Sequence, residues 1–243
     1  MTTPGSTFTR ADHSGTGPGA ITPDGCSVQM YSRLPDNGET EIIAAAVPPG
    51  ATLLELGAGA GRMTRPLLAR GFHVTALDES PQMLEMIQGS GAPTVRAAIE
   101  DLDLQRRFDV VTLTSFLVNT ADDALRPRLL RACARHVEPE GCVLIQREPD
   151  DRHEKLKPGV AWSRGGMTIS VVSIEPAGEG VSRTCIGYDF EDAQWTQTFY
   201  SQLLKTPRFE AALAEAGLTV DAYLTDDRSW VRARLQAEAQ APE

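Results

Sequence analysis

Short apolar runs alternate with amphipathic segments through the first two thirds of the chain. Five of these runs have the length and the leucine or β-branched content of buried parallel strands: 53–56, 72–78, 94–97, 108–114 and 142–146. Helices are predicted between them, and a helix at 208–216 precedes two final strands at 218–225 and 229–235. The pattern predicts an α/β fold with a Rossmann-like, seven-stranded, mostly parallel sheet that contains one antiparallel strand.

The pattern changes after the fifth strand, where alternating β-branched, aromatic and polar residues replace continuous apolar runs. Three antiparallel strands are predicted there: 168–174, 182–190 and 194–203. We therefore expect an inserted antiparallel β-subdomain at 150–205, placed above the carboxyl ends of the parallel strands as a cover for the substrate. The main domain then comprises 25–149 and 206–236. Residues 1–24 are rich in glycine, threonine, serine and proline without periodicity, which predicts disorder.

Charge and composition exclude several classes of function. The formal net charge is −10, and no basic stripe is visible, so a nucleic-acid partner is disfavoured. No apolar run approaches the ~18 residues that span a membrane, and the N-terminus lacks a signal pattern, so we expect a cytoplasmic protein without a membrane partner. The four cysteines are scattered without a C-x-x-C pair, so neither a disulfide framework nor a metal site is predicted.

The first predicted strand leads into a glycine-rich turn. Glu55 lies two residues before Gly57, and Ala58, Gly59 and Gly61 complete the turn. A dinucleotide-binding turn requires G-x-G-x-x-G, and an arginine occupies the place of its last glycine. A carboxylate beside the turn disfavours a pyrophosphate but suits a ligand that carries an ammonium and a sulfonium. This charge pattern fits S-adenosylmethionine.

An acidic pair follows the second predicted strand. Asp78 ends this strand, where a carboxylate is placed to accept hydrogen bonds from both hydroxyl groups of a ribose, and Glu79 comes next. Met83 lies in the helix that follows. It either covers one face of an adenine or packs in the core.

A second acidic pair, Glu100 and Asp101, follows the third predicted strand. We expect Asp101 to accept a hydrogen bond from the exocyclic amine of adenine, while the backbone of Leu102 meets the edge of the ring. The alternative is a solvated acidic loop. Thr114, at the end of the fourth strand, is a further candidate for contact with the cofactor.

In order and approximate spacing, these residues resemble the glycine motif, ribose acid and adenine acid of the class I S-adenosylmethionine-dependent methyltransferases. The resemblance covers about 47–146, and within the family the chain is similar to bacterial small-molecule methyltransferases of secondary metabolism. It implies S-adenosylmethionine as cofactor, S-adenosylhomocysteine as product, and residues 25–46 as a lid. Tyr31 of this lid would contact the cofactor, whereas the alternative for the segment is packing on the sheet edge.

Polar residues at the tips of the fourth and fifth strands are candidates for proton transfer. Ser115 and Asn119 follow the fourth strand, and Arg147, Glu148, Asp150 and His153 follow the fifth. Histidine titrates near neutral pH and suits a general base, although a surface histidine in a polar loop is the alternative. Asn119 is better suited to holding backbone or cofactor near the reacting atoms than to moving protons.

Three further residues are candidates for binding the acceptor. Arg147 suits a carboxylate or a phosphate, or else pairs with Glu148 or Asp150. Tyr188 and Trp195 belong to the aromatic set of the insert, which either lines an apolar pocket or forms the core of the subdomain.

The leading hypothesis is transfer of a methyl group to N or O of a small molecule in natural-product biosynthesis, by in-line displacement that depends mainly on positioning. The alternatives are a peptide or protein methyltransferase and a non-catalytic module that binds S-adenosylmethionine. A nicotinamide-dependent oxidoreductase is disfavoured by the arginine in the glycine turn. We expect a monomer or a homodimer.

Overall fold

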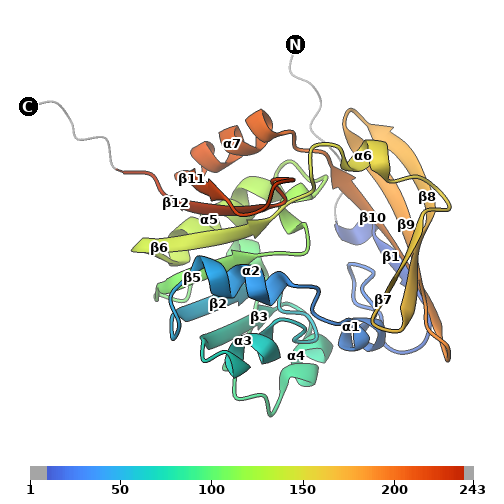
Figure 1. Cartoon of the computed structure of the whole chain (residues 1–243), viewed down its shortest axis with the longest axis horizontal. Helices are drawn as coiled ribbons and strands as arrows, with labels where there is room; N and C mark the ends of the chain where they lie inside the picture. The colour runs from blue at the N-terminus through green and yellow to red at the C-terminus, as the bar shows by residue number, and fades with distance from the viewer. Residues whose placement is uncertain (1–9, 238–243) are drawn as a thin grey trace, which may run out of the picture.

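The computed structural model describes residues 10–237, which form two sheets and the helices around them (Figure 1). The larger sheet has seven strands in the order β11-β12-β6-β5-β2-β3-β4. Their bounds are β2 Thr52–Leu56, β3 His73–Asp78, β4 Thr94–Arg96, β5 Phe108–Leu113, β6 Val137–Gln146, β11 Leu218–Tyr223 and β12 Trp230–Leu235. β12 runs antiparallel to both of its neighbours, whereas the remaining pairings in the sheet are parallel. The predicted Rossmann-like sheet with one antiparallel strand is confirmed.

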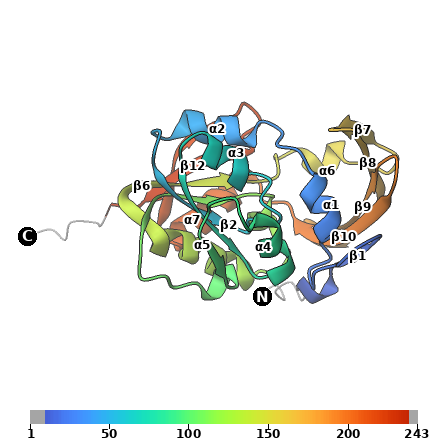
Figure 2. The same cartoon turned by 90° about the horizontal axis from the view of Figure 1, so that it is seen from below.

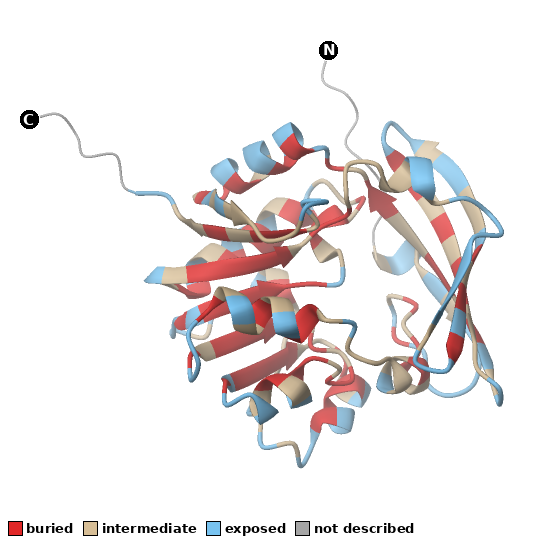
Figure 3. Cartoon of the chain, viewed as in Figure 1, coloured by how far each residue is buried: buried red, intermediate tan, exposed pale blue. Residues whose placement is uncertain are grey.

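Helices cover both faces of this sheet. They are α2 Glu39–Ala46, α3 Thr64–Ala69, α4 Pro81–Ile87, α5 Leu125–His136 and α7 Thr206–Glu215, with short 3-10 helices η2 Ile99–Asp101 and η3 Leu117–Asn119. One core cluster joins α5 and α7 to the sheet, and a second joins α2 and α3 to its other face. Leu54 belongs to the first cluster and Leu53 to the second, and both are fully buried. Burial of each side chain contributes ~2 kcal/mol of transfer free energy. Figure 3 shows how strongly buried residues concentrate in the strands between the helix layers.

The smaller sheet is antiparallel and has five strands in the order β1-β10-β9-β8-β7. Their bounds are β1 Ser14–Thr16, β7 Ala161–Arg164, β8 Met167–Gly178, β9 Val181–Asp189 and β10 Gln194–Gln202. The three strands predicted in the insert correspond to β8, β9 and β10. Two neighbours at the edges, β7 and β1, were not predicted, so the sheet is larger than the insert alone.

The prediction of disorder is wrong for residues 10–24, and residues 1–9 lie outside the described part of the chain. Arg10–Asp12 forms the 3-10 helix η1, and β1 pairs with the edge of β10. A Cβ on Gly15 would lie 2.1 Å from the carbonyl oxygen of Gly25, so the two segments pass in close backbone contact. Composition misled the prediction because the order of this segment comes from pairing with a distant strand.

The five-stranded sheet stands across the carboxyl ends of the parallel strands (Figures 1 and 2). Helix α1 (Val28–Arg33) lies between the two sheets near the start of the chain, and α6 (Arg152–Lys155) lies where the chain crosses from β6 to the smaller sheet. Among residues 10–237, no helix is both long and apolar enough to cross a membrane. The arrangement encloses the edge of the larger sheet at which Rossmann-like folds bind their ligands.

Candidate functional site

The glycine turn after β2 is shaped by three residues in the left-handed region. Gly57, Gly59 and Gly61 have φ values of 71°, 55° and 84°. A Cβ on Gly57 would meet a leucine methyl at 3.0 Å, and one on Gly61 would meet two side chains at 3.0 Å. A Cβ on Gly59 would meet no atom within 4 Å. Gly57 and Gly61 therefore keep the turn packed, whereas Gly59 borders open space that a ligand can fill.

Asp78 connects the end of β3 to this turn. Its Oδ2 accepts a hydrogen bond from the backbone N–H of Gly59 at 2.8 Å, and its Oδ1 accepts one from Ser80 at 2.9 Å. Burial raises the pKa of this carboxyl, and the two N–H donors offset part of that rise. The predicted ribose acid thus lies beside the open glycine. Its contact with a ribose stays a prediction.

Three buried polar atoms near the turn and the strand tips have no hydrogen-bond partner among the described residues: Glu55 Oε1, Glu100 Oε2 and Thr114 Oγ1. The other oxygen of Glu55 accepts a hydrogen bond from the hydroxyl of Thr64 at 2.6 Å. Complete burial raises the pKa of Glu55 to about 7. Buried acceptors of this kind suit a ligand that brings donors and positive charge, so these residues fit S-adenosylmethionine.

Tyr31 of α1 spans the gap between the glycine turn and the smaller sheet. It packs against Ala60 and Met83, and its hydroxyl donates to Gln197 Oε1 at 3.0 Å. Met83 is 3% exposed, as expected for a core residue. Burial raises the pKa of the Tyr31 phenol. Cofactor contact by these two side chains stays a prediction, although Tyr31 lies where a lid would meet the ligand.

The acidic pair in η2 differs from what was predicted. The Asp101 side chain is 70% exposed and pairs with Arg128 at 2.5 Å. The N–H of Leu102 is bonded to the carbonyl oxygen of Ile99 at 3.2 Å, and contact of its backbone with an adenine edge stays a prediction. Glu100 is the buried member of the pair, with 9% side-chain exposure. One turn of 3-10 helix thus turns Asp101 outward and Glu100 inward.

Arg10 of η1 holds both Glu79 and Glu100. Its Nη1 lies 2.8 Å from Glu79 Oε2, and its Nη2 pairs with Glu100 Oε1. A basic residue from the N-terminal segment therefore joins two of the predicted cofactor-side acids, an interaction that no local sequence signal indicates.

The tip of β5 has an unusual backbone. Ser115 and Phe116 are consecutive residues in the left-handed region, with φ of 54° and 61°, which costs ~1–2 kcal/mol per residue. The N–H of Ser115 donates to Gln146 Oε1 at 2.9 Å, so the side chain that ends β6 holds the turn. Strained turns of this kind are concentrated at functional sites. The Ser115 side chain is exposed, and its catalytic role stays a prediction.

For Asn119 the structure agrees with the interpretation favoured above, that this side chain holds backbone and does not move protons. This residue is 1% exposed, its Nδ2 donates to the carbonyl oxygen of Gln202 at 2.9 Å, and its Oδ1 accepts from the N–H of Glu148 at 2.8 Å. Both ends of the amide are occupied by backbone groups from β10 and from the tip of β6. Asn119 therefore fastens the smaller sheet to the larger one.

Two predicted acceptor residues are core residues instead. Arg147 is fully buried, pairs with Asp150, and lies with its guanidinium 5.0 Å from the ring centroid of Phe209. Trp195 is 2% exposed and its indole N–H donates to the carbonyl oxygen of Pro18 at 2.8 Å. Neither is available to a substrate, because each packs toward other parts of the fold.

Tyr188 lies on the face of the smaller sheet that packs around Ile169 and Ile186, and burial raises the pKa of its phenol. It is only partly buried. Its contact with an acceptor stays a prediction.

His153, in α6, lies between the two sheets. Its Nε2 is 3.5 Å from Glu148 Oε2, and its Nδ1 is 3.2 Å from the hydroxyl of Ser182 on β9. Glu148 is 2% exposed, and its Oε1 lies 2.9 Å from Nε of Arg152. His153 and Glu148 were predicted as candidates because they follow the tip of a strand. Ser182 was missed because only the folding of β9 brings it there.

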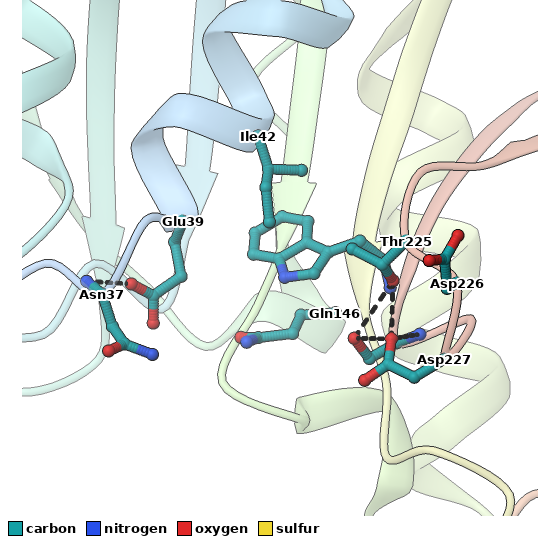
Figure 4. A pocket seen from close by; sticks show the side chains of 9 residues that line it. Asn37, Glu39, Ile42, Gln146, Thr225, Asp226 and Asp227 are labelled. Carbon is teal, nitrogen blue, oxygen red and sulfur yellow. Dashed lines mark hydrogen bonds between the residues drawn. The ribbon is translucent and has the colours of Figure 1, made fainter.

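A pocket of about 420 Å³ opens at the same edge of the larger sheet, between the start of α2 and the turn that joins β11 to β12 (Figure 4). Its lining residues are Asn37, Glu39, Ile42, Gln146, Thr225, Asp226, Asp227, Ser229 and Trp230. Gln146 connects the pocket to the tip of β5 through its bond to Ser115. In the described part of the chain, no three histidine, cysteine, aspartate or glutamate side chains are grouped as a metal site.

Comparison with known proteins agrees with this geometry. Residues 53–141 match the model of a family described as the methyltransferase domain. The match spans β2 to β6, with the glycine turn, Asp78 and the strained tip of β5. This part of the chain is therefore similar to a methyltransferase domain, and the structures that share its fold include one solved with S-adenosylmethionine bound.

Individual relatives cover only part of the chain. The cypemycin N-terminal methyltransferase of a Streptomyces species is 34% identical over 103 residues, 40% of this chain and 41% of the relative. A probable ribosomal RNA small subunit methyltransferase A of Pyrobaculum aerophilum is 32% identical over 140 residues, 57% of this chain and 58% of the relative. The chain thus spans about half the length of these curated relatives.

The fold extends further than the sequence similarity. CalS10, an amino pentose methyltransferase from Micromonospora echinaspora involved in calicheamicin biosynthesis, was solved with S-adenosylmethionine bound. It aligns with a TM-score of 0.62 at 23% identity, over 86% of this chain and 92% of its own. At this identity the likeness concerns the fold, and it includes the region that carries the smaller sheet.

Proposed function

We propose that this protein transfers the methyl group of S-adenosylmethionine to N or O of a small molecule held between the two sheets. One observation carries the proposal. Asp78 accepts a hydrogen bond from the N–H of Gly59, and Gly59 borders open space. This part of the turn lies at the edge of the larger sheet that the smaller sheet covers. The description of CalS10, a fold relative involved in calicheamicin biosynthesis, supports a place in natural-product biosynthesis. The net charge of −10 supports an acceptor other than a nucleic acid.

The proposed roles follow from the position of each side chain. S-adenosylmethionine supplies a methyl group on a positively charged sulfur. Asp78 accepts hydrogen bonds from the ribose, and the buried carboxyl of Glu55 favours the positive charge of the ligand. The smaller sheet excludes water and orients the acceptor against the tip of β5. Orientation alone supplies up to ~7–11 kcal/mol in well-aligned reactions.

His153 is the proposed base. It lies beyond the tip of β6 beside Glu148, whose N–H donates to Asn119 after the β5 tip, so it is placed to take up the proton that an amine or a hydroxyl loses before the methyl group moves. Such a base typically adds ~10²–10⁴-fold to the rate, less than positioning contributes.

The test is transfer of labelled methyl from S-adenosylmethionine into an extract of the source organism, separated into small molecules and macromolecules. We expect label in one small metabolite in the presence of the wild-type protein, and much less label with Asp78→Ala when S-adenosylmethionine is not saturating. Absence of label from every fraction, together with measurable binding of S-adenosylhomocysteine, would instead support a non-catalytic binding module.

A peptide amino terminus is the second candidate acceptor. It is favoured by similarity to the cypemycin N-terminal methyltransferase over 103 residues. Label in the peptide or protein fraction of the same experiment would support it, and the space under the smaller sheet would then serve as an open groove.

A further inference from the structure

A carboxylate, an imidazole and a hydroxyl lie in line at the junction of the two sheets. Glu148 and Ser182 are 2% and 7% exposed, and the imidazole of His153 between them keeps 20% side-chain exposure. Among the described residues, neither Glu148 Oε2 nor His153 Nε2 forms a hydrogen bond of good geometry, although the two atoms are 3.5 Å apart. These are buried, unsatisfied groups that face each other, an arrangement that is costly unless it has a use.

Glu148, His153 and Ser182 lie beside the tip of β5. The N–H of Glu148 is held by Asn119, which follows that tip within η3. The guanidinium of Arg152 lies 5.0 Å from the ring centroid of Phe116, one of the two strained residues. Arg152 also occupies Glu148 Oε1, which leaves Oε2 for the imidazole. The three groups are therefore fixed relative to the turn against which an acceptor would be aligned.

The hydrogen-bonding pattern selects one form of the neutral imidazole. With Nε2 protonated, the N–H points toward the Glu148 carboxylate, and Nδ1 is free to accept from the Ser182 hydroxyl. The opposite tautomer would place an unprotonated nitrogen against a carboxylate, which has no proton to donate when ionised. Glu148 thus makes Nδ1 the basic atom, on the side of the smaller sheet.

We propose that Ser182, His153 and Glu148 relay the proton that the acceptor loses, an inference that rests on the proposed methyl transfer. The acceptor atom gives its proton to Ser182 Oγ as Ser182 gives its own to His153 Nδ1. The imidazolium keeps its other N–H toward Glu148, whose negative charge stabilises it. The freed electron pair forms the new bond to the methyl carbon, and the carbon–sulfur bond breaks with its electrons left on sulfur. The proton then leaves Nδ1 for water, through Ser182 Oγ, once the methylated product has departed.

In this scheme Ser182 touches the acceptor, and Glu148 is a positioning residue. Glu148→Gln and Ser182→Ala are each expected to lower the rate of label transfer roughly 100-fold at saturating S-adenosylmethionine, within the range for general-base catalysis. Affinity for S-adenosylhomocysteine is expected to stay unchanged. Glu154→Gln, an exposed carboxylate of the same helix, is the matched control and is expected to keep the wild-type rate.

A second readout does not depend on turnover. In protein labelled with ¹⁵N-histidine, the ring nitrogens of His153, assigned with a His153→Gln variant, are expected to report the Nε2–H tautomer. Glu148→Gln is expected to give a mixture of both tautomers. Wild-type rates in both variants, or a tautomer that is unaffected by Glu148→Gln, would overturn the relay. A protein that transfers no label but shows the tautomer shift would refute the proposed function while leaving the hydrogen-bonded line intact.

Discussion

The two sheets of this molecule reach their structures by different routes. In the larger sheet, successive strands and helices follow one another along the chain, and Asp78 and the glycine turn lie at the ends of strands that pair directly. The smaller sheet instead pairs β1, near the start of the chain, with β10, about 180 residues later. Local order therefore builds the proposed cofactor side, and long-range pairing builds the proposed cover.

This difference separates the two kinds of site residue. Cofactor-side residues depend on backbone geometry that the motif itself encodes, such as the left-handed conformation of Gly59. Acceptor-side residues depend on which faces of β9 and β10 meet the larger sheet. Variants on the first side should change binding of the cofactor, and variants on the second side should change turnover.

The largest expected effect is a pH dependence of stability caused by Glu55. Its pKa of about 7 in the folded protein is above the ordinary value of 4.5, so the unfolded chain ionises first. Below pH 4.5 Glu55 is protonated in both states and does not change the free energy of unfolding. As pH rises from 4.5 to about 7, the free energy of unfolding falls by up to ~3 kcal/mol. Denaturant unfolding from pH 4 to pH 8 should show this loss in wild type and a flatter profile in Glu55→Gln. The same dependence of stability on pH in wild type and Glu55→Gln would contradict a raised pKa of the buried Glu55 carboxyl.

The next effect concerns Asp78. Asp78→Ala removes the acceptor for the Gly59 N–H as well as the proposed ribose ligand, so affinity for S-adenosylhomocysteine should fall roughly 30-fold, about 2 kcal/mol. Calorimetric titration measures it. Asp103→Ala, an exposed acid near η2, is the matched control and should bind like wild type. Equal affinities for the two variants would remove Asp78 from the cofactor site.

Two alanine substitutions in the same turn should separate binding from folding. Gly59→Ala adds a methyl group toward open space and should cost ~1 kcal/mol of stability for its left-handed backbone, while weakening cofactor binding about tenfold. Gly61→Ala places a Cβ 3.0 Å from the side chains of Arg65 and Ile87. This variant should therefore lower the free energy of unfolding more than it weakens cofactor binding. If both variants lose stability equally and bind equally, Gly59 does not border the ligand.

The smallest effect tests the correction in η2. Asp101→Asn should change affinity for S-adenosylhomocysteine less than twofold, because an exposed ion pair such as that with Arg128 contributes ~0–1 kcal/mol. Glu100→Gln, at the buried neighbour, should weaken binding several-fold. A larger loss in Asp101→Asn than in Glu100→Gln would restore the original assignment.

The sequence was sufficient for the seven-stranded, mostly parallel sheet with one antiparallel strand and for Asp78 at the end of its strand, because both follow from the periodicity of apolar residues. It failed where a residue's surroundings come from distant parts of the chain. Trp195 bonds Pro18 and Arg147 bonds a residue that leads into α7, and both side chains are buried there. Because these partners are distant in the sequence, the chemistry of the two side chains alone suggested substrate contact. Ser182 carries no local signal at all. Its proximity to His153 depends on the position of β9.

The central claim is that cofactor and acceptor meet at the carboxyl edge of the larger sheet, beneath the smaller one. The most direct measurement is a crystal structure of the protein with S-adenosylhomocysteine. We predict the ribose on Asp78, backbone contact at Gly59 and the sulfur directed toward the tip of β5 at Ser115. A ligand bound away from Gly59, or a sulfur directed away from the smaller sheet, would contradict the account.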